Sequence, residues 1–346
     1  PVTCDLFFDS DLAEHCPGIR IPAGSWPAGL LDGIAQLPAL PVIYSGGLEN
    51  HPELIRHLEE RHEIIGNSSA VLEKALDPFA VSNCLAGAGL RVPEIRQPGE
   101  ELPMDPDWLS KPIRSGGGLG IESAAEAETS EGRYLQRFVD GVPASALFLA
   151  GKNDSTHQAL LLGATEQLIG ESWLGAGGFT YCGNLGPIEL EEETLREVGR
   201  AGAATADEFS LRGLFGLHFI LTDAGPVFIE LNPRYTASVE VIETSCGFAT
   251  IPHHLAACRD GELPAIAPPP SRACAKAILF AETPVAMSAS HALVEENAAT
   301  VADIPAVGET IEAGSPLLTV LTEGPDLASC EANLARLARE ARALFE

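Results

Sequence analysis

The chain has 346 residues, of which 45% are hydrophobic and 20% charged, and this ordinary globular composition excludes a largely disordered or fibrous protein. The formal net charge is -28 at pH 7, which repels phosphate backbones and anionic lipids. We therefore expect neither nucleic acid nor a membrane as a partner.

The sequence favours a cytoplasmic protein. No stretch approaches the roughly 20 uninterrupted apolar residues that a membrane span needs. Residues 1–11 carry acids, where a signal peptide carries Lys or Arg. Because a single hydrophobic core usually stops growing at about 250 to 300 residues, we expect two or three packed units in the chain.

The first part of the chain has the pattern of a parallel α/β unit. Residues 40–44 form an apolar run that ends in a Gly-Gly turn at residues 46–47, and a helix with Pro52 in its first turn follows. A second strand is expected over residues 63–66. This order indicates a small Rossmann-like layer, which we place over residues 1–76. The glycine pair is compatible with a phosphate site, although an ordinary turn is the favoured interpretation.

Helices and antiparallel strands are expected next. A helix over residues 77–90 is capped by Asp77, and later helices are predicted over residues 191–209 and 251–258. Alternating apolar residues predict four strands, over residues 109–113, 134–139, 144–149 and 159–162. A proline-rich linker over residues 264–272 leads into a short β-rich segment and an amphipathic helix at the end of the chain.

A lysine and a glycine-rich loop form the first candidate site. Residues 110–121 read as a strand that runs through Lys111 into a loop containing Ser115, Gly116, Gly117 and Gly118. Glycines let the backbone approach an anion, and a lysine at a strand end supplies a mobile charge for phosphate oxygens. The loop is therefore a candidate lid over a triphosphate, with a flexible hairpin loop as the alternative. It is neither a Walker loop nor a dinucleotide fingerprint, because no helix signal follows the glycines.

A second candidate site lies in a hairpin over residues 217–234, whose turn ends at Gly225. Alternation along the second strand puts Glu230 and Asn232 on one face, and a three-residue turn puts His218 opposite Glu230. Burying an acid and an amide among apolar neighbours is unfavourable without a partner, so a bound cation explains them. Mg²⁺ suits this set because proteins hold it by one or two carboxylates together with substrate phosphates.

The end of this hairpin adds a further candidate. Pro233 ends the strand, so Arg234 can direct a bidentate donor toward the same phosphates. The alternative for the whole hairpin is a strand end whose polar residues face water. Residues 136–141, which read Gln-Arg-Phe-Val-Asp-Gly, indicate no more than a strand and a turn when they are taken alone.

Along the chain, the lysine and its glycine-rich loop come first, the Gln-Arg-Phe-Val strand second, and the hairpin with Glu-Leu-Asn-Pro-Arg third. With its motifs in this order, the chain resembles the ATP-grasp superfamily over roughly residues 40–260. In that family two α+β lobes clamp ATP. The resemblance implies a mixed α/β and α+β fold with four parts: the Rossmann-like unit at 1–76, a small lobe at 77–150, a large lobe with the metal site at 151–262, and a C-terminal β-rich segment at 273–346.

The resemblance also implies roles for single residues. Lys111 would contact the α and β phosphates of ATP and Arg234 the transferring group, so both are candidate catalytic residues. Glu230 and Asn232 would bind Mg²⁺, with His218 at the third ligand position. The other nucleotide-binding candidates are Ser115, Gly116, Gly117 and Gly118 in the closing loop, and Gln136, Phe138 and Val139 beside the adenine.

Within the superfamily the chain looks like the carboxylate-amine ligase branch and is similar to the tyramine glutamate ligase type linked to methanofuran-like cofactors. The implied reaction activates a carboxylate as an acyl phosphate, forms an amide with an amine, and releases ADP and phosphate. The expected partners are therefore small-molecule acids and amines, and the sequence leaves a homo-oligomer open. The alternatives are an ATP-dependent carboxylase, a small-molecule kinase, or a non-catalytic nucleotide-binding module.

Two positions depart from the family pattern. The family usually has an acid where His218 stands, which puts a second Mg²⁺ in doubt. It often has an Asp-Lys pair where this chain has Asp77 and Pro78, so one phosphate-binding lysine is missing, and Lys74 or Arg114 would have to compensate. These departures keep the non-catalytic alternative open.

Overall fold

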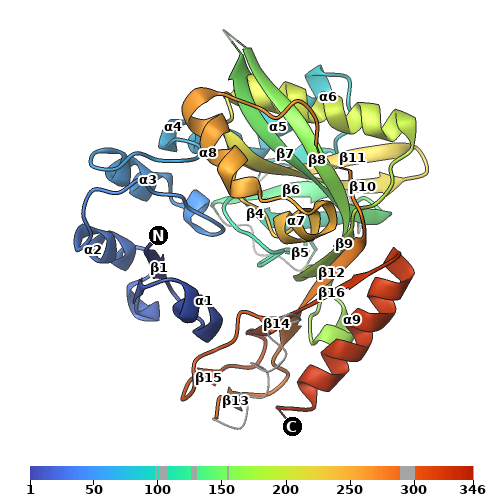
Figure 1. Cartoon of the computed structure of the whole chain (residues 1–346). Helices are drawn as coiled ribbons and strands as arrows, with labels where there is room; N and C mark the ends of the chain where they lie inside the picture. Colours follow the sequence, from blue (N-terminus) through green and yellow to red (C-terminus); the bar gives the residue numbers. More distant parts are fainter. Residues whose placement is uncertain are drawn as a thin grey trace. The chain divides into compact units, whose positions relative to one another are not determined.

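The computed structural model describes residues 1–97, 100, 107–125, 131–153, 156–267, 269–288 and 301–345. They form two compact units (Figure 1). Unit 1 comprises Pro1–Leu40, Leu168–Gly186 and Ser271–Glu346, and unit 2 comprises Pro41–Gln167 and Pro187–Pro270. This grouping follows packing and does not test the four-part division expected from the sequence, whose boundaries stay predictions. The mixed α/β class is confirmed.

Unit 2 is built on four long antiparallel strands in the order β11, β10, β7, β8, which run side by side in Figure 1. They are β7 (Val142–Asn153), β8 (Thr156–Ile169), β10 (Gly213–Thr222) and β11 (Gly225–Asn232). The strands expected over residues 144–149 and 159–162 are confirmed, and both extend further than the sequence pattern indicated.

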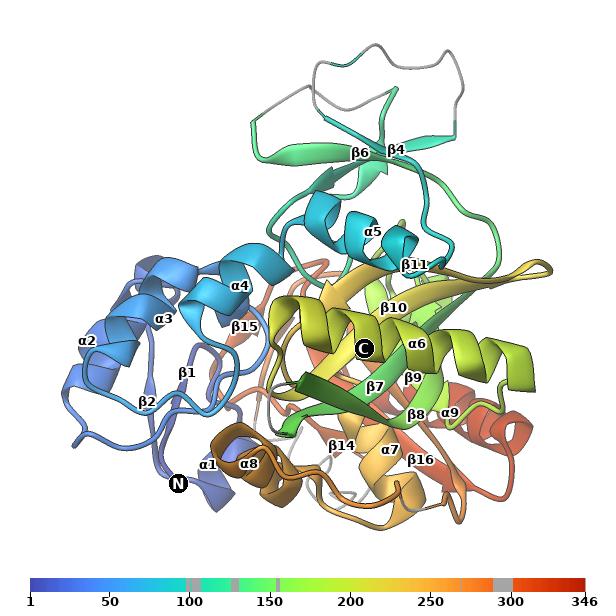
Figure 2. The same cartoon turned by 90° about the horizontal axis from the view of Figure 1, so that it is seen from above.

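Helices cover both faces of these strands. Alternate residues of a strand point to opposite faces, so β7 contributes to two cores. One core includes Ala144, Ala146, Phe148 and Ala150 of β7 with Val198, Ala201 and Ala206 of α6 (Glu192–Phe209), which lies over β7 in Figure 2. The other includes Leu147 and Leu149 with residues of α7 (Val239–Cys246) and α8 (Thr250–Asp260). Burial on both faces explains why β7 is apolar at nearly every position.

A second, smaller sheet of unit 2 carries the predicted lysine strand. Its antiparallel strands, in the order β3, β6, β4, β5, are β3 (Ile95–Arg96), β6 (Arg133–Arg137), β4 (Trp108–Pro112) and β5 (Glu122–Ser123). Helix α5 (Pro78–Gly87), which follows α4 (Ser69–Ala75), packs against this sheet, since the rings of Phe79 and Tyr134 lie 6.4 Å apart. The Asp77 carboxylate accepts the Phe79 backbone N–H at 2.9 Å, which confirms the expected cap.

The Rossmann-like expectation is met only by short parallel pairings. In unit 1, β1 (Thr3–Asp5) pairs in parallel with β2 (Gly18–Arg20). In unit 2, Val42 and Ile64 form an isolated parallel bridge on either side of α3 (Pro52–Glu59). Residues 40–44 therefore do not form the full strand that was expected, because Pro41 has no N–H to extend a ladder.

The β-rich C-terminal segment is confirmed within unit 1. Its longer strands, β12 (Ala273–Phe280) and β16 (Pro316–Gly324), pair antiparallel and pack against α9 (Leu327–Arg342). The shorter strands of this segment are β13 (Val285–Ala286), β14 (Val301–Ala302) and β15 (Thr310–Ile311). Strand β9 (Tyr181–Gly186), from an earlier part of unit 1, pairs antiparallel with β12. The short helices elsewhere are α1 (Ser10–His15), α2 (Gly29–Ala35), η1 (Ala23–Ser25), η2 (Leu48–Asn50) and η3 (Ser172–Leu174).

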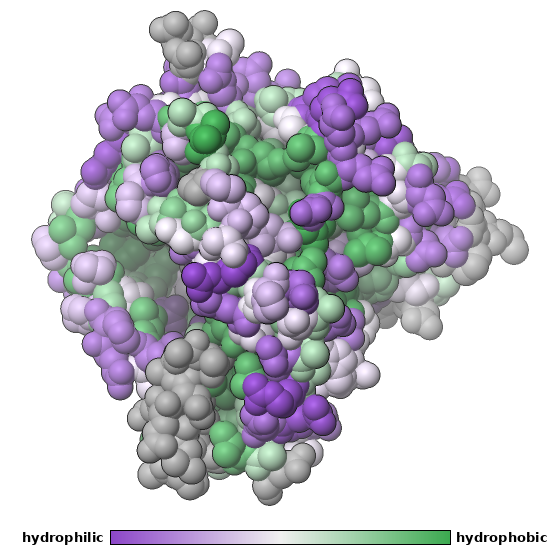
Figure 3. Space-filling view, turned by 45° about the vertical axis from the view of Figure 1, so that its right-hand side comes forward, coloured by the Kyte–Doolittle hydropathy of each residue, from purple (hydrophilic) through white to green (hydrophobic). Residues whose placement is uncertain are grey.

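Among the described helices, none combines the length and the apolar character that crossing a membrane requires. On the face that Figure 3 shows, hydrophilic and hydrophobic residues are interspersed over the surface.

Two glycines one turn apart on α6 test its packing on β7. A Cβ at Gly202 would lie 2.3 Å from Cε1 of Phe148, whereas a Cβ at Gly199 would meet no described heavy atom within 4 Å. Gly202→Ala should therefore lower the free energy of unfolding by about 1–3 kcal/mol through overpacking. Gly199→Ala should raise it by up to about 1 kcal/mol, because alanine favours a helix. Urea unfolding measures both, and shifts of the same sign would contradict this packing.

Candidate nucleotide and metal site

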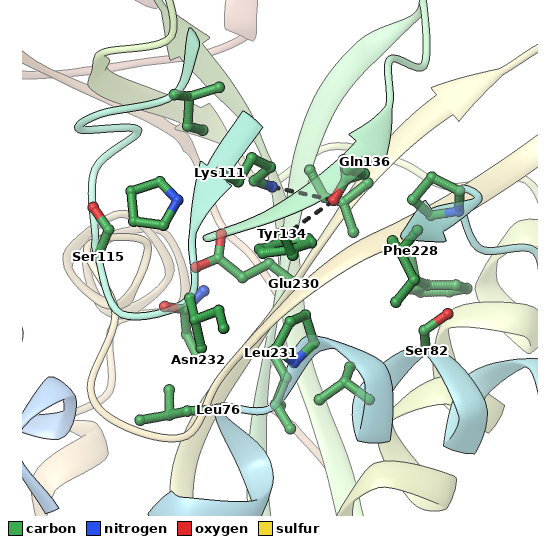
Figure 4. Close-up of a pocket in the computed structure, with 18 of the residues that line it drawn as sticks. Leu76, Ser82, Lys111, Ser115, Tyr134, Gln136, Phe228, Glu230, Leu231 and Asn232 are labelled. Atoms are coloured by element: carbon green, nitrogen blue, oxygen red, sulfur yellow. Dashed lines mark hydrogen bonds between the residues drawn. The ribbon is translucent and has the colours of Figure 1, made fainter. Parts of the chain in front are cut away.

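A pocket of unit 2 opens between α5, strands β4 and β6, and the end of β11 (Figure 4). Its empty volume is about 850 Å³, open solvent at the mouth included. One end is apolar and is lined by Val81, Leu85, Val92, Ile95 and Phe228. The other end is polar and is lined by Glu49, Lys111, Gln136, Glu230 and Asn232. Such a division suits a ligand with a flat apolar part and a charged part.

Lys111 is buried at the polar end, with 8% of its surface exposed. Its Nζ donates to Oε1 of Gln136 at 3.2 Å and lies 5.7 Å from the ring centroid of Tyr134, whose hydroxyl also donates to that Gln136 oxygen at 3.5 Å (Figure 4). Burial lowers the pKa of Lys111, and the charge of Glu230 acts in the opposite direction. An ammonium has three donors and Gln136 takes one, so this group can also bind an anion in the pocket.

The glycine-rich loop follows β4 directly and borders the same pocket. Ser115, Gly116 and Gly118 line it. Gly117 and Gly118 have φ angles of 63° and 76°, a region that favours glycine, and a Cβ on Gly117 would meet no atom within 4 Å among the described residues. The glycine at position 117 is therefore explained by backbone conformation and not by lack of space.

The β10–β11 hairpin brings His218 opposite Glu230, as expected, but by a different route. Thr222 pairs with Gly225, so the turn has two residues instead of three. A bulge between the pairs of His218 and Phe219 leaves Ile229 without a partner in the ladder and supplies the missing residue. The prediction counted one residue too many in the turn and did not include the bulge. These two errors cancel, and the predicted pairing of His218 with Glu230 is confirmed.

Glu230 is held by the histidine opposite it. Oε2 of Glu230 lies 3.3 Å from Nδ1 of His218, and the Glu230 side chain is 40% exposed. Partial burial opposes its ionisation, but the His218 hydrogen bond and the charges of His218, Lys111 and Arg234 outweigh it and lower the pKa of Glu230 to about 2. The other ring nitrogen of His218 lies 3.4 Å from Nε2 of Gln167. Glu230 is therefore a carboxylate at neutral pH.

The donor set fits one hard cation. Glu230 and Asn232 both line the pocket and offer a carboxylate and an amide oxygen, which are the oxygen ligands that Mg²⁺ prefers when phosphates supply the others. His218 directs Nδ1 at Glu230, so in this structure it holds the carboxylate. The part of the chain that the structure describes contains no cluster of three His, Cys, Asp or Glu residues that could hold a metal without a substrate.

Arg234 does not line the pocket itself and is held by three acceptors, of which Glu49 and Asn232 belong to the lining. Its Nε bonds to Oε1 of Glu49, NH1 donates to the Tyr235 carbonyl at 2.9 Å, and NH2 donates to Oδ1 of Asn232 at 3.2 Å. Its side chain is 14% exposed. In this conformation the guanidinium orients Asn232 and pairs with Glu49.

The pocket brings together most of the residues expected from the sequence: Lys111, Ser115, Gly116, Gly118, Gln136, Glu230 and Asn232. Its described lining does not include Gly117, Phe138, Val139, His218 or Arg234, and Phe138 is 43% exposed. The roles assigned to these residues stay predictions.

Sequence reasoning missed Glu49, Tyr134 and the pocket face of α5. Glu49 comes two positions after the Gly-Gly turn at residues 46–47, and this position was the sequence feature that could have indicated it. Tyr134 had none, since an aromatic residue in a strand is ordinary.

The comparisons identify the fold. Residues 75–238 match the ATP-grasp domain family. An uncharacterized protein of Methanocaldococcus jannaschii is 24% identical over 267 residues, which cover 75% of this chain and 64% of that protein. An ADP complex of N5-carboxyaminoimidazole ribonucleotide synthetase matches 100% of this chain and 91% of that chain, with a TM-score of 0.72 and 14% identity.

A single-chain, multi-domain long-chain acyl-CoA carboxylase has a TM-score of 0.71 and 17% identity, covering 100% of this chain and 36% of that one. The chain thus spans less than two thirds of the length of the curated relative and of this carboxylase. The structural likeness shows the ATP-grasp fold.

The His218 contact predicts how Glu230 titrates. His218→Ala removes the hydrogen bond and a charge but leaves burial, so the pKa of Glu230 should rise from about 2 toward or above its ordinary 4.5. Because the native pKa is the lower one, ionised Glu230 stabilises the fold above about pH 4.5, and this stabilisation is lost as pH falls toward 2. In the variant this contribution should shrink or disappear, because the native pKa of Glu230 then approaches its ordinary value.

Carbon-13 NMR of the glutamate carboxyl groups measures this pKa directly. His253→Ala is the control, because its ring packs against Phe248 and not against Glu230. A Glu230 titration that is the same in wild type and His218→Ala would refute the assignment.

Proposed function

We propose, on the premise that the chain belongs to the ATP-grasp superfamily, that it is an ATP-dependent ligase that activates a carboxylate and joins it to an amine. One observation carries this proposal: buried Lys111 and ionised Glu230, with Asn232 beside it, face one pocket bordered by a glycine-rich loop. A cation on one side and a metal-type donor pair on the other suit a triphosphate with its metal ion.

The pocket accounts for each part of the nucleotide. Its apolar end, with Val81, Leu85 and Phe228, suits the flat base. Lys111 meets phosphate oxygens as a point charge. Glu230 and Asn232 would hold Mg²⁺, which neutralises the charge that develops on the phosphates.

The proposed chemistry needs little covalent help from the protein. An oxygen of the substrate carboxylate attacks the γ-phosphorus, the bond to the β-phosphate oxygen breaks, and ADP leaves. The amine nitrogen then attacks the acyl carbon, phosphate leaves, and the nitrogen gives up a proton. Phosphoryl transfer depends mainly on positioning and on neutralising charge, so preorganised Lys111 and Glu230 supply what the first step requires.

Hydroxylamine offers a test that does not require the amine to be known, because it traps acyl phosphates as hydroxamates. The chain should release ADP with a suitable acid, and mass spectrometry should find the hydroxamate. A stable phosphate ester would instead indicate a kinase, and bicarbonate-dependent turnover a carboxylase. Tight nucleotide binding without ADP release from a broad panel of acids and amines would support the non-catalytic alternative, which the histidine at position 218 favours.

Removing either charge should slow catalysis. We expect Lys111→Ala and Glu230→Gln each to reduce kcat by a factor on the order of 10² to 10³, comparable to the loss of one preorganised electrostatic contact. Lys152→Ala and Glu63→Gln serve as matched controls, because Lys152 is exposed and Glu63 lies in an exposed ion pair with Arg259. Steady-state rates of ADP release measure all four, and near-normal turnover in both pocket variants would remove the assigned site.

A further inference from the structure

Glu49 is a buried carboxylate that the nucleotide site leaves unexplained. It lies in η2, directly after Gly47, whose φ of 98° turns the chain in a conformation that favours glycine. Only 2% of Glu49 is exposed, yet the residue lines the polar end of the pocket. An acid at this depth needs a partner, because burying an unpaired charge is costly.

Arg234 satisfies one oxygen of that carboxylate. Its Nε bonds to Oε1 of Glu49, and its other two nitrogens are taken by Tyr235 and Asn232. The turn lies directly on the guanidinium, since a Cβ on Gly46 would be 3.7 Å from Cζ of Arg234. The pair therefore connects the turn at residues 46–47 to the metal end of β11.

The second oxygen, Oε2 of Glu49, has no hydrogen-bond partner among the residues that the structure describes. A carboxylate oxygen only accepts hydrogen bonds, and leaving a buried acceptor unsatisfied is unfavourable. Oε2 has almost no accessible surface in this conformation, but Glu49 lines the pocket, so a ligand that displaces the atoms covering this oxygen can supply the donor. The group that completes this position must carry N–H or O–H hydrogens.

Neighbouring hydrogen bonds hold the pair in place. The side chain of Asn67 donates to the Pro233 carbonyl at 2.9 Å and accepts the Arg212 backbone N–H at 2.9 Å. The Tyr44 hydroxyl donates to the Asn67 carbonyl at 2.7 Å. Contacts of this kind, around a functional group, fix its position before a ligand arrives.

We infer that Glu49 forms the subsite for the amine substrate, an inference that rests on the proposed ligase function. That reaction has three ligands, and ATP and the acid are both anions that a carboxylate repels. An ammonium group has N–H donors and positive charge, and both match Oε2. Through Arg234 the subsite adjoins Asn232, at the metal end of the pocket where an acyl phosphate would form.

Binding of a small cation tests this without requiring turnover. The probes are ethylammonium, ethanol and acetate, which are similar in size and differ in charge, each measured by saturation-transfer NMR with Mg-ADP present. The wild type should bind ethylammonium in preference to the other two. Equal signals from the three, or a preference for acetate, would overturn the inference, and this arm needs no variant.

Glu49→Gln is the decisive variant, because it keeps the size and the oxygen that Arg234 requires but replaces the free acceptor by a donor. It should weaken ethylammonium binding by about tenfold or more. Glu49→Asp keeps the charge and should weaken it less. Glu59→Gln is the control, since Glu59 is a part-buried acid that accepts from the Ser69 backbone and hydroxyl at 2.8 and 2.7 Å. Unchanged binding in Glu49→Gln would refute the subsite.

The two proposals can fail separately. If the acid and hydroxylamine screen gives no ADP while Glu49→Gln loses ethylammonium, the ligase function fails and the cation site stands. If ADP and hydroxamate form but Glu49→Gln leaves binding of ethylammonium unchanged, the ligase stands and the subsite fails. In an active enzyme, Glu49→Gln should raise KM for a charged amine more than KM for hydroxylamine, which is neutral near pH 7.5.

Discussion

The site depends on the opposite charges of Lys111 and Glu230, which share one pocket with an apolar far end. Each affects the other, since Glu230 raises the pKa of Lys111 against burial and Lys111 helps to keep Glu230 ionised. Two charges in such a place persist only when they are paired or bound to a ligand. The structure places a cation and an anion on different sheets of unit 2, where a metal-bound anion can satisfy both.

The polar residues around this pair divide into two groups. His218 holds Glu230 from the opposite strand, so in this structure its side chain orients the carboxylate. Arg234 joins two lining residues, Asn232 and Glu49. The guanidinium therefore links Asn232, a proposed metal ligand, to a segment that precedes the residues matching the ATP-grasp domain family, and that segment gains a direct part in the proposed ligand site.

Much of this could be predicted because its signals are local. Apolar alternation marked the long strands, Asp77 marked a helix start, and the glycines beside Lys111 marked a loop that borders the pocket. Long-range details were harder. The turn of the hairpin was predicted one residue too long, and the bulge at Ile229, which compensates for it, has no local signal because it depends on how Phe228 packs in the core while Glu230 meets His218.

The sequence by itself determined the order of most elements, the ATP-grasp resemblance and the candidate residues for phosphate or metal binding, since these follow from residue type and spacing. Only the tertiary structure decided which of them meet. It turned Arg234 toward Glu49, left Phe138 exposed, and added Tyr134 and Glu49 to the pocket. These outcomes depend on contacts between residues up to 185 positions apart, as Glu49 and Arg234 are. Hydrophobic periodicity and short motifs describe neighbouring residues only, so they cannot predict such contacts.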